Sequence, residues 1–296
     1  MMSCTFDDLR RLPNAICALL ALAMLLVAAC GGSDDDTGGT IEHPSRAGDV
    51  ILRIEELDVF SPLGDATEVP LLTLYGDGTL IVLDRQADAT ATGLPALERY
   101  LLNEEGIQYI LGEAESAGLL DGDERFAGPY QDVPVTRFTA TAAGATSITR
   151  VDGLHLTDPA DIPEGEREDR ERLSELATLA FSRGVWLTDE RLLEAGTAFD
   201  AERLQVVSLP DDTPAQPADP IWPLETSLVD LRAEGSSFGF DDATRCFELT
   251  GMDARQFTSA LAELGSSGRA GTTWQSDDQL FDIYARPLLP DQAACA

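Results

Sequence analysis

An unbroken apolar run near the N-terminus constrains this chain more than any other feature. The run from Ala15 to Ala29 contains 15 small or apolar residues and follows a short head that carries Arg10 and Arg11. A transmembrane helix needs about 20 such residues, whereas the apolar part of a secretory leader needs roughly 7–15. The run therefore predicts that residues 1–29 are a leader that directs the rest of the chain out of the cytoplasm.

The run ends in Val27-Ala28-Ala29-Cys30, which is an aliphatic residue, two small residues and a cysteine. This pattern resembles the lipobox of bacterial lipoproteins, and the resemblance covers residues 1–30 only. It implies a diacylglycerol thioether on Cys30, cleavage after Ala29 and usually an acylated new amino group. Two or more acyl chains anchor a protein stably to a bilayer. The alternatives are an ordinary secretory signal and an uncleaved helix in which Cys30 is incidental.

Residues 30–48 are expected to form a flexible acidic tether. The stretch GlyGlySerAspAspAspThrGlyGlyThr at 31–40 has no apolar side chain to bury, and such Gly-rich segments behave as flexible coils. With Cys30 acylated, the tether would hold a folded body on the extracytoplasmic side of the cell membrane or outer envelope. The Asp34–Asp36 run is interpreted as a solvated spacer, with a cation site as the alternative. His43, also in this stretch, is assigned no role.

The five cysteines are consistent with the same extracytoplasmic location. Cys4 and Cys17 would leave with the leader and Cys30 would be acylated, so Cys246 and Cys295 would remain. In an oxidising envelope these two permit one disulfide. They lie 49 positions apart, and closing a loop of that length stabilises the fold by about 4 kcal/mol according to the chain-entropy estimate. Two free thiols or a redox pair are the alternatives, although the chain has no Cys-x-x-Cys spacing that would favour redox chemistry.

The charge excludes several functions. The chain carries 53 Asp and Glu against 20 cationic residues, all of them Arg, for a formal net charge of −33. The absence of lysine excludes Schiff-base catalysis, a P-loop lysine and a Ser–Lys dyad. So strong an anion repels the phosphate backbone, so we expect no nucleic-acid binding. The 44% of hydrophobic residues is nevertheless enough for a packed core.

The order of strand and helix patterns in residues 49–209 predicts one α+β domain. Helix 103–117 has Asn103 as a candidate cap and an apolar stripe that indicates a core face. Strands are predicted at 49–54, 71–75, 79–83, 135–142, 146–151 and 204–209, and helices at 103–117, 166–183 and 188–195. Strands and helices do not alternate one for one, which favours antiparallel hairpins with two main helices over a doubly wound α/β fold.

Five prolines between positions 210 and 223 predict a stiff connector, because proline breaks helices and central strands. Trp222 lies between two of these prolines and is interpreted as an anchor to the core, with a ligand-stacking role as the alternative. Residues 224–296 are expected to form a smaller α+β subdomain closed by the disulfide. Its predicted elements are a strand at 245–250, a helix at 253–264, a strand at 280–286 and a possible partner strand at 272–275.

Short segments of the body resemble those of a loose group of uncharacterised lipoproteins from high-GC bacteria. They are LeuTyrGlyAspGlyThrLeuIle at 74–81, Glu105-Gly106-Ile107, Trp222-Pro223 and ArgProLeuLeuPro at 286–290. The segments are short and scattered, and the resemblance implies no particular activity.

A search for catalytic chemistry yields no catalytic, cofactor-binding or metal-ligating residue. Ser237 lies in a Gly-x-Ser-x-Gly match, but both histidines precede it, whereas an α/β-hydrolase needs a histidine after its serine. His155 is the only histidine of the body, which is too few for a zinc site. The segment 121–126 begins like a calcium loop and fails at its fifth and sixth positions.

The sequence therefore favours a non-catalytic role in binding, interaction or envelope maintenance, with the lipid bilayer as partner through acylated Cys30. It identifies no protein or small-molecule partner and no cofactor. The alternatives are a secreted hydrolase that uses two carboxylates and a solute-binding lipoprotein. Two carboxylates roughly 5–10 Å apart in a pocket would favour the hydrolase.

Overall fold

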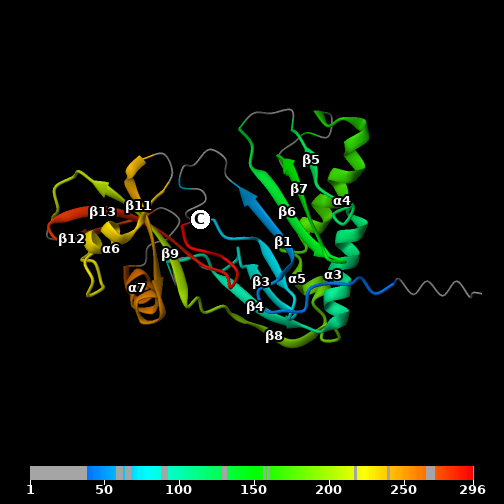
Figure 1. The fold of residues 1–296 in the computed structure, drawn as a ribbon, viewed down its shortest axis with the longest axis horizontal. Coiled ribbons are helices and arrows are strands. Elements are labelled where there is room, and N and C mark those ends of the chain that lie inside the picture. Colours follow the sequence, from blue (N-terminus) through cyan, green and yellow to red (C-terminus); the bar gives the residue numbers. More distant parts are fainter. Residues whose placement is uncertain are drawn as a thin grey trace, which may run out of the picture. The chain divides into compact units, whose positions relative to one another are not determined.

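The structure is a computed structural model of the chain. It describes residues 39–57, 63, 68–87, 93–128, 132–155, 158, 161–216, 219–238, 241–264 and 271–295, and the expected leader and Cys30 lie outside these residues. Residues 41–296 form one compact unit. Two sheets with flanking helices build this unit, so the expected α+β class is confirmed (Figure 1).

The first sheet has the strand order β5-β7-β6-β1-β2-β3-β4-β8. Its strands are β1 (Val50–Leu57), β2 (Leu72–Tyr75), β3 (Thr79–Leu83), β4 (Leu97–Leu102), β5 (Glu124–Phe126), β6 (Val135–Ala142), β7 (Ala145–Asp152) and β8 (Leu192–Ala198). Neighbouring strands are antiparallel, except for the parallel pair β5 and β7. The two hairpins expected from the sequence are confirmed as β2–β3 and β6–β7.

Helices α3 (Glu104–Ser116) and α4 (Arg167–Thr178) supply apolar side chains to the core of this sheet (Figure 1). The side chain of Asn103 accepts a hydrogen bond from the backbone N–H of Gly106, which confirms it as the cap of α3. The helix expected at 166–183 is interrupted instead. After α4 the chain turns, and a separate short helix, α5 (Arg183–Trp186), follows.

The prediction of a short helix at 188–195 is wrong. Residues Leu192–Ala198 form β8, which pairs antiparallel with β4 at the edge of the first sheet. Leu, Glu and Ala favour a helix locally, but a free neighbouring strand offers this segment a ladder of backbone hydrogen bonds. Long-range pairing therefore outweighs local propensity here.

The second sheet has the order β10-β11-β9-β13-β12. Its strands are β9 (Arg203–Asp211), β10 (Ser236–Phe238), β11 (Asp241–Thr250), β12 (Thr272–Ser276) and β13 (Gln279–Pro287), and its helices are α6 (Leu228–Glu234) and α7 (Gly251–Leu264). The expected pairing of 272–275 with the last strand is confirmed as β12–β13. Strand β9 was expected to close the domain before the connector, but it lies in the middle of this second sheet, so the change of sheet falls upstream of residue 210.

The proline-rich segment begins inside the central strand β9, where Pro210 pairs with Phe281, so the expectation that its prolines preclude a central strand is wrong at this position. The last residues of the segment lie against the edge strand β12. Ile221 forms a parallel bridge with Gln275 of β12, and Trp222 donates its backbone N–H to the Gln275 carbonyl at 2.8 Å. The Trp222 ring is 6% exposed and packs against Phe257 and Trp274, with ring centroids 5.2 and 6.0 Å away. Trp222 is therefore buried in the core of the second sheet, as expected of an anchor.

The expected tether ends before residue 48, because the chain contacts the body from residue 41 onward. The backbone N–H of Ile41 donates to Gln108 Oε1 at 2.8 Å, and Gln108 Nε2 donates back to the Ile41 carbonyl at 2.9 Å. The N–H of Ala143 donates to the Glu42 carbonyl at 2.7 Å. These contacts fix residues 41 and 42 against α3 and the β6–β7 turn.

Candidate functional site

A polar cavity of about 470 Å³ lies over the face of the first sheet formed by Arg53, Glu55 and Arg137. Register places these three side chains together, because Glu55 is the cross-strand partner of Arg137 and Arg53 lies two residues from Glu55 on the same strand. The cavity is lined by Arg53, Glu55, Glu56, Leu57, Glu68, Val69, Pro70, Arg137, Gln205, Arg286, Asp291, Gln292 and Ala293. We call it the Arg53 cavity.

One wall of the cavity contains the ion pair between Arg53 of the first sheet and Asp291 of the C-terminal segment. Asp291 Oδ1 accepts a hydrogen bond from Arg53 Nη2 at 2.6 Å and another from the Tyr75 hydroxyl at 2.7 Å. Arg53 Nε also donates to Thr73 Oγ1 at 3.2 Å. Burial opposes the charge of Arg53, but the hydrogen bond and negative charge of Asp291 outweigh it and raise the pKa of Arg53.

Tyr75 is held in its neutral form by the same arrangement. Burial first, and then the hydrogen bond and charge of Asp291, raise the pKa of Tyr75 well above its usual value, although the nearby Arg53 acts in the opposite direction. The phenol therefore acts as a hydrogen-bond donor to Asp291 and is not available as a base.

The opposite wall belongs to the second sheet. Gln205 Oε1 accepts hydrogen bonds from Arg286 Nη2 at 3.3 Å and from the backbone N–H of Cys295 at 3.0 Å. Arg286 Nη1 donates to Gln292 Oε1 at 2.9 Å. Side-chain amides from a central strand and from the C-terminal segment thus fix the position of the Arg286 guanidinium.

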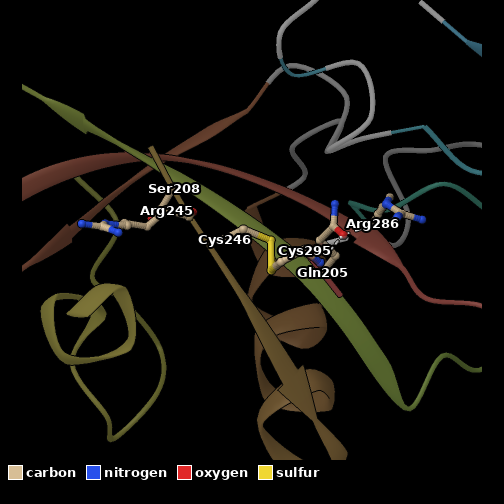
Figure 2. Close-up of a disulfide and its surroundings, with 6 residues drawn as sticks. All are labelled: Gln205, Ser208, Arg245, Cys246, Arg286 and Cys295. Atoms are coloured by element: carbon tan, nitrogen blue, oxygen red, sulfur yellow. Dashed lines mark hydrogen bonds between the residues drawn. A yellow bond between two sulfur atoms is a disulfide. The ribbon is translucent and has the colours of Figure 1, made fainter. Parts of the chain in front are cut away.

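The expected disulfide is confirmed and adjoins this wall. Cys246 of β11 and Cys295 are bonded, with Cα atoms 5.6 Å apart, and Cys295 lies 49 positions after Cys246 in the sequence. Figure 2 shows Gln205 and Arg286 beside Cys295. The bridge attaches the end of the chain to the second sheet, while Asp291 attaches the same segment to the first sheet.

Three of the four carboxylates that line the cavity, those of Glu55, Glu56 and Asp291, pair with arginines. Glu55 Oε2 is 2.7 Å from Arg137 Nη2, and Glu56 pairs with Arg85 in the same way that Asp291 pairs with Arg53. A hydrolase would need one such group free to donate or accept a proton at the substrate. These three carboxylates are therefore already occupied by contacts within the chain.

Residues singled out in the sequence lie apart from this cavity. His155 is exposed in a turn after β7. The ring of His43 contacts the Glu104 carboxylate at 3.2 Å, and hydrogen bonds from Gln108 and then His43 hold the pKa of Glu104 below its usual value. Ser237 lies on the edge strand β10, which follows a helix, whereas a nucleophile elbow lies between a strand and the helix after it.

Asp123 belongs to the segment that begins like a calcium loop, and its carboxylate is hydrogen-bonded to the backbone of the same chain. Its Oδ1 accepts the backbone N–H of Ile148 at 2.7 Å, next to the parallel pair β5–β7. Within the part of the chain that the structure describes, no group of three or more His, Cys, Asp or Glu is placed to hold a metal ion.

Sequence reasoning missed the residues of the Arg53 cavity. Arg53, Gln205 and Asp291 are separated by more than 80 positions from one another and belong to no spaced motif. The one signal nearby is the ArgProLeuLeuPro segment at 286–290, which ends immediately before Asp291.

Comparison with known proteins identifies no relative. No protein-family model matches the chain, and neither a curated protein nor a solved structure matches it. Among the residues that the structure describes, no helix has the length and apolar character needed to cross a membrane.

Proposed function

We propose that this chain is a lipid-anchored protein of the extracytoplasmic side of a bacterial envelope, attached through acylated Cys30. The observation that carries the proposal is the Cys246–Cys295 disulfide in a chain whose apolar run ends in Val-Ala-Ala-Cys. Disulfides persist in oxidising compartments such as the periplasm or the cell surface and are rare in the cytosol. The disulfide and the lipobox pattern thus favour the same compartment by independent arguments.

The body of the protein binds a partner or ligand and does not catalyse a reaction. This part of the proposal is supported by the Arg53 cavity, where three carboxylates are engaged by Arg53, Arg85 and Arg137. Guanidinium groups, side-chain amides and carboxylates together offer both donors and acceptors, which suits a polar ligand.

Expression of the full chain in a lipoprotein-processing bacterium tests the anchor. We expect the wild-type protein and a Cys17→Ala control to incorporate labelled fatty acid and to sediment with membranes. Cys30→Ala should incorporate none and should retain its leader or be released. Fatty-acid incorporation into Cys30→Ala equal to that of the wild type would refute the proposal, and Cys17→Ala shows that loss of a leader cysteine alone has no effect.

A further inference from the structure

The segment that enters the body of the protein is held on α3 by a connected set of hydrogen bonds. Gln108 bonds to both backbone groups of Ile41, accepting the N–H at 2.8 Å and donating to the carbonyl at 2.9 Å. Gln108 Nε2 also donates to Glu104 Oε1 at 2.9 Å, and Glu104 in turn contacts the ring of His43. In Figure 1 this segment is the blue trace that passes beside α3. We call Ile41, His43, Glu104 and Gln108 the N-terminal clasp.

Both ring nitrogens of His43 face oxygen atoms that can only accept a hydrogen bond. Nδ1 lies 2.6 Å from the carbonyl oxygen of Pro44, and Nε2 lies 3.2 Å from Oε1 and 3.4 Å from Oε2 of Glu104. A backbone carbonyl and an ionised carboxylate carry no proton to donate, and the neutral imidazole ring has a single N–H. The protonated ring has two. Both contacts of His43 are therefore hydrogen bonds only when the ring is protonated and positively charged.

Glu104 is kept ionised by its surroundings. Hydrogen bonds from Gln108 and then from His43 lower the pKa of Glu104, although burial acts in the opposite direction. Glu104 is also the first residue of α3, where the partial positive charge of the helix end favours a carboxylate. The acceptor opposite His43 Nε2 is therefore a charged group that gains most from a positively charged donor.

The acceptor opposite Nδ1 is fixed in place by the β2–β3 turn. A Cβ on Gly76 would lie 2.7 Å from the Pro44 carbonyl oxygen and 2.8 Å from the backbone N and O of Arg46, so the turn packs directly on this segment. The N–H of Gly76 also donates to the Asp49 carbonyl at 2.9 Å. Because the His43 side chain is only 11% exposed, water replaces little of a contact that is lost. A neutral ring thus leaves one nitrogen lone pair facing an oxygen atom.

Other charged residues lie on the elements around His43. They are Glu42, Arg46 and Asp49 of its own segment, Glu105 of α3 and Asp77 of the β2–β3 turn. Carboxylates ordinarily titrate near pH 4 and arginine above about pH 12, so histidine is the side chain whose charge ordinarily changes between about pH 5 and 8. The chain has two histidines, and the other, His155, is exposed in a turn after β7. Replacing each histidine in turn therefore separates their effects.

We propose that His43 is a pH-dependent latch, whose protonation fastens residues 41–44 to α3 and whose deprotonation loosens them. The docked segment makes one hydrogen bond more with the protonated ring than with the neutral ring, so docking is favoured as the pH falls and disfavoured as it rises. Release of these four residues lengthens the chain before the body by at most about 14 Å. With Cys30 acylated, this release would let the body move further from the bilayer, and this consequence alone rests on the proposed function.

Hydrogen exchange of single backbone amides in the purified full chain, in nonionic detergent, tests this proposal. The Ile41 N–H donates to α3 and the Ala143 N–H donates to the Glu42 carbonyl, so the protection factors of these two reporter amides measure docking. We expect both to fall about five-fold or more between about pH 5.5 and pH 8. The Leu83 N–H, which donates to the Leu71 carbonyl at 3.0 Å in the first sheet, should keep its protection factor.

Matched variants assign the change to His43. His43→Gln keeps a polar side chain that cannot change charge, so its reporter amides should have the same protection factor at both pH values. His155→Gln removes the other histidine and should behave like wild type. Glu104→Gln keeps an acceptor oxygen without the charge and should lower the protection at pH 5.5, whereas Glu105→Gln, at the neighbouring exposed position of α3, should not.

Reporter amides in the wild type that keep the same protection factor across this pH range would overturn the proposal. A decline in His43→Gln as large as that in the wild type would overturn it too. Cys30→Ala should show the undiminished decline, because every residue of the clasp lies in the body. The result for the latch is therefore distinguishable from the result for the lipid anchor.

Discussion

The hydroxyl of Tyr75 donates a hydrogen bond of 2.7 Å to Asp291, a residue 216 positions further along the chain. Asp291 also accepts from Arg53, which lies on the strand next to that of Tyr75. Four residues after Asp291, Cys295 is bonded to the second sheet. A single short C-terminal segment therefore contacts both sheets through specific polar and covalent bonds.

Asp291→Asn should destabilise the protein by about 2–4 kcal/mol, because it leaves the Arg53 guanidinium without its counter-charge. The Arg53 side chain is only 12% exposed, so water cannot replace the lost carboxylate. Urea unfolding measures the change. Asp189→Asn, at an exposed position, is the matched control and should stay within about 0.5 kcal/mol of wild type. Equal stability of the two variants would show that the Arg53–Asp291 pair contributes nothing.

Stability should fall as the pH rises above about 10, the ordinary pKa of tyrosine in an unfolded chain. Burial, with a hydrogen bond to Asp291, raises the pKa of Tyr75, and burial with a hydrogen bond to Glu98 raises the pKa of Tyr100 to about 12. The unfolded chain then loses these protons while the folded chain keeps them, so folding is progressively disfavoured.

Urea midpoints at pH 8, 9, 10 and 11 measure this dependence. Tyr75→Phe and Tyr100→Phe each remove one of the two groups and should flatten the decline above pH 10. A double variant that declines as steeply as wild type would exclude these tyrosines as its source.

Trp222→Ala should cost about 3–5 kcal/mol, the range for truncating a buried aromatic side chain. Trp222 is 6% exposed and contacts Phe257 and Trp274, whereas the preceding Ile221 is 76% exposed. Ile221→Ala should therefore change the free energy of unfolding by less than about 0.5 kcal/mol. Thermal unfolding of both variants checks the difference, and similar losses in the two would contradict the anchoring role of Trp222.

Gly78→Ala should destabilise the protein by at least about 2 kcal/mol, because alanine is strained at positive φ. Gly78 has a φ of +84°, and a Cβ there would lie 2.4 Å from the Leu102 carbonyl oxygen. Gly112, inside α3, has open space around its Cα, so Gly112→Ala should stabilise the protein by about 0.5–1 kcal/mol. Chemical unfolding measures both changes. If the free energy of unfolding changed in the same direction in the two variants, this contrast would be contradicted.

Local signals in the sequence predicted several elements correctly. Asn103 begins α3 because its side chain caps a free backbone N–H, and the Gly76-Asp77-Gly78 turn joins β2 to β3 because Gly78 takes a positive φ. The disulfide followed from elimination among five cysteines, three of which were assigned to the expected leader and lipid anchor. Each of these predictions depends on residues near in sequence or on the small number of possible partners.

Long-range features could not be predicted in this way. Leu192–Ala198 has the composition of a helix and becomes a strand because β4 offers a free edge. The sheet to which β9 belongs is decided by its pairing with β11 and β13, which no local pattern specifies. The Arg53 cavity also depends on long-range contacts, since Arg53 and Asp291 are hydrogen-bonded although they lie 238 positions apart in the sequence.

Intact-mass analysis of the full chain, extracted from bacterial membranes without reductant, tests the central claim most directly. The account predicts one species that begins at Cys30, carries the mass of two or three acyl chains and lacks two hydrogens because Cys246 and Cys295 are joined. A protein that retained residues 1–29, or that began elsewhere without acyl mass, would contradict the lipid anchor. Free thiols at Cys246 and Cys295 would contradict the oxidising compartment.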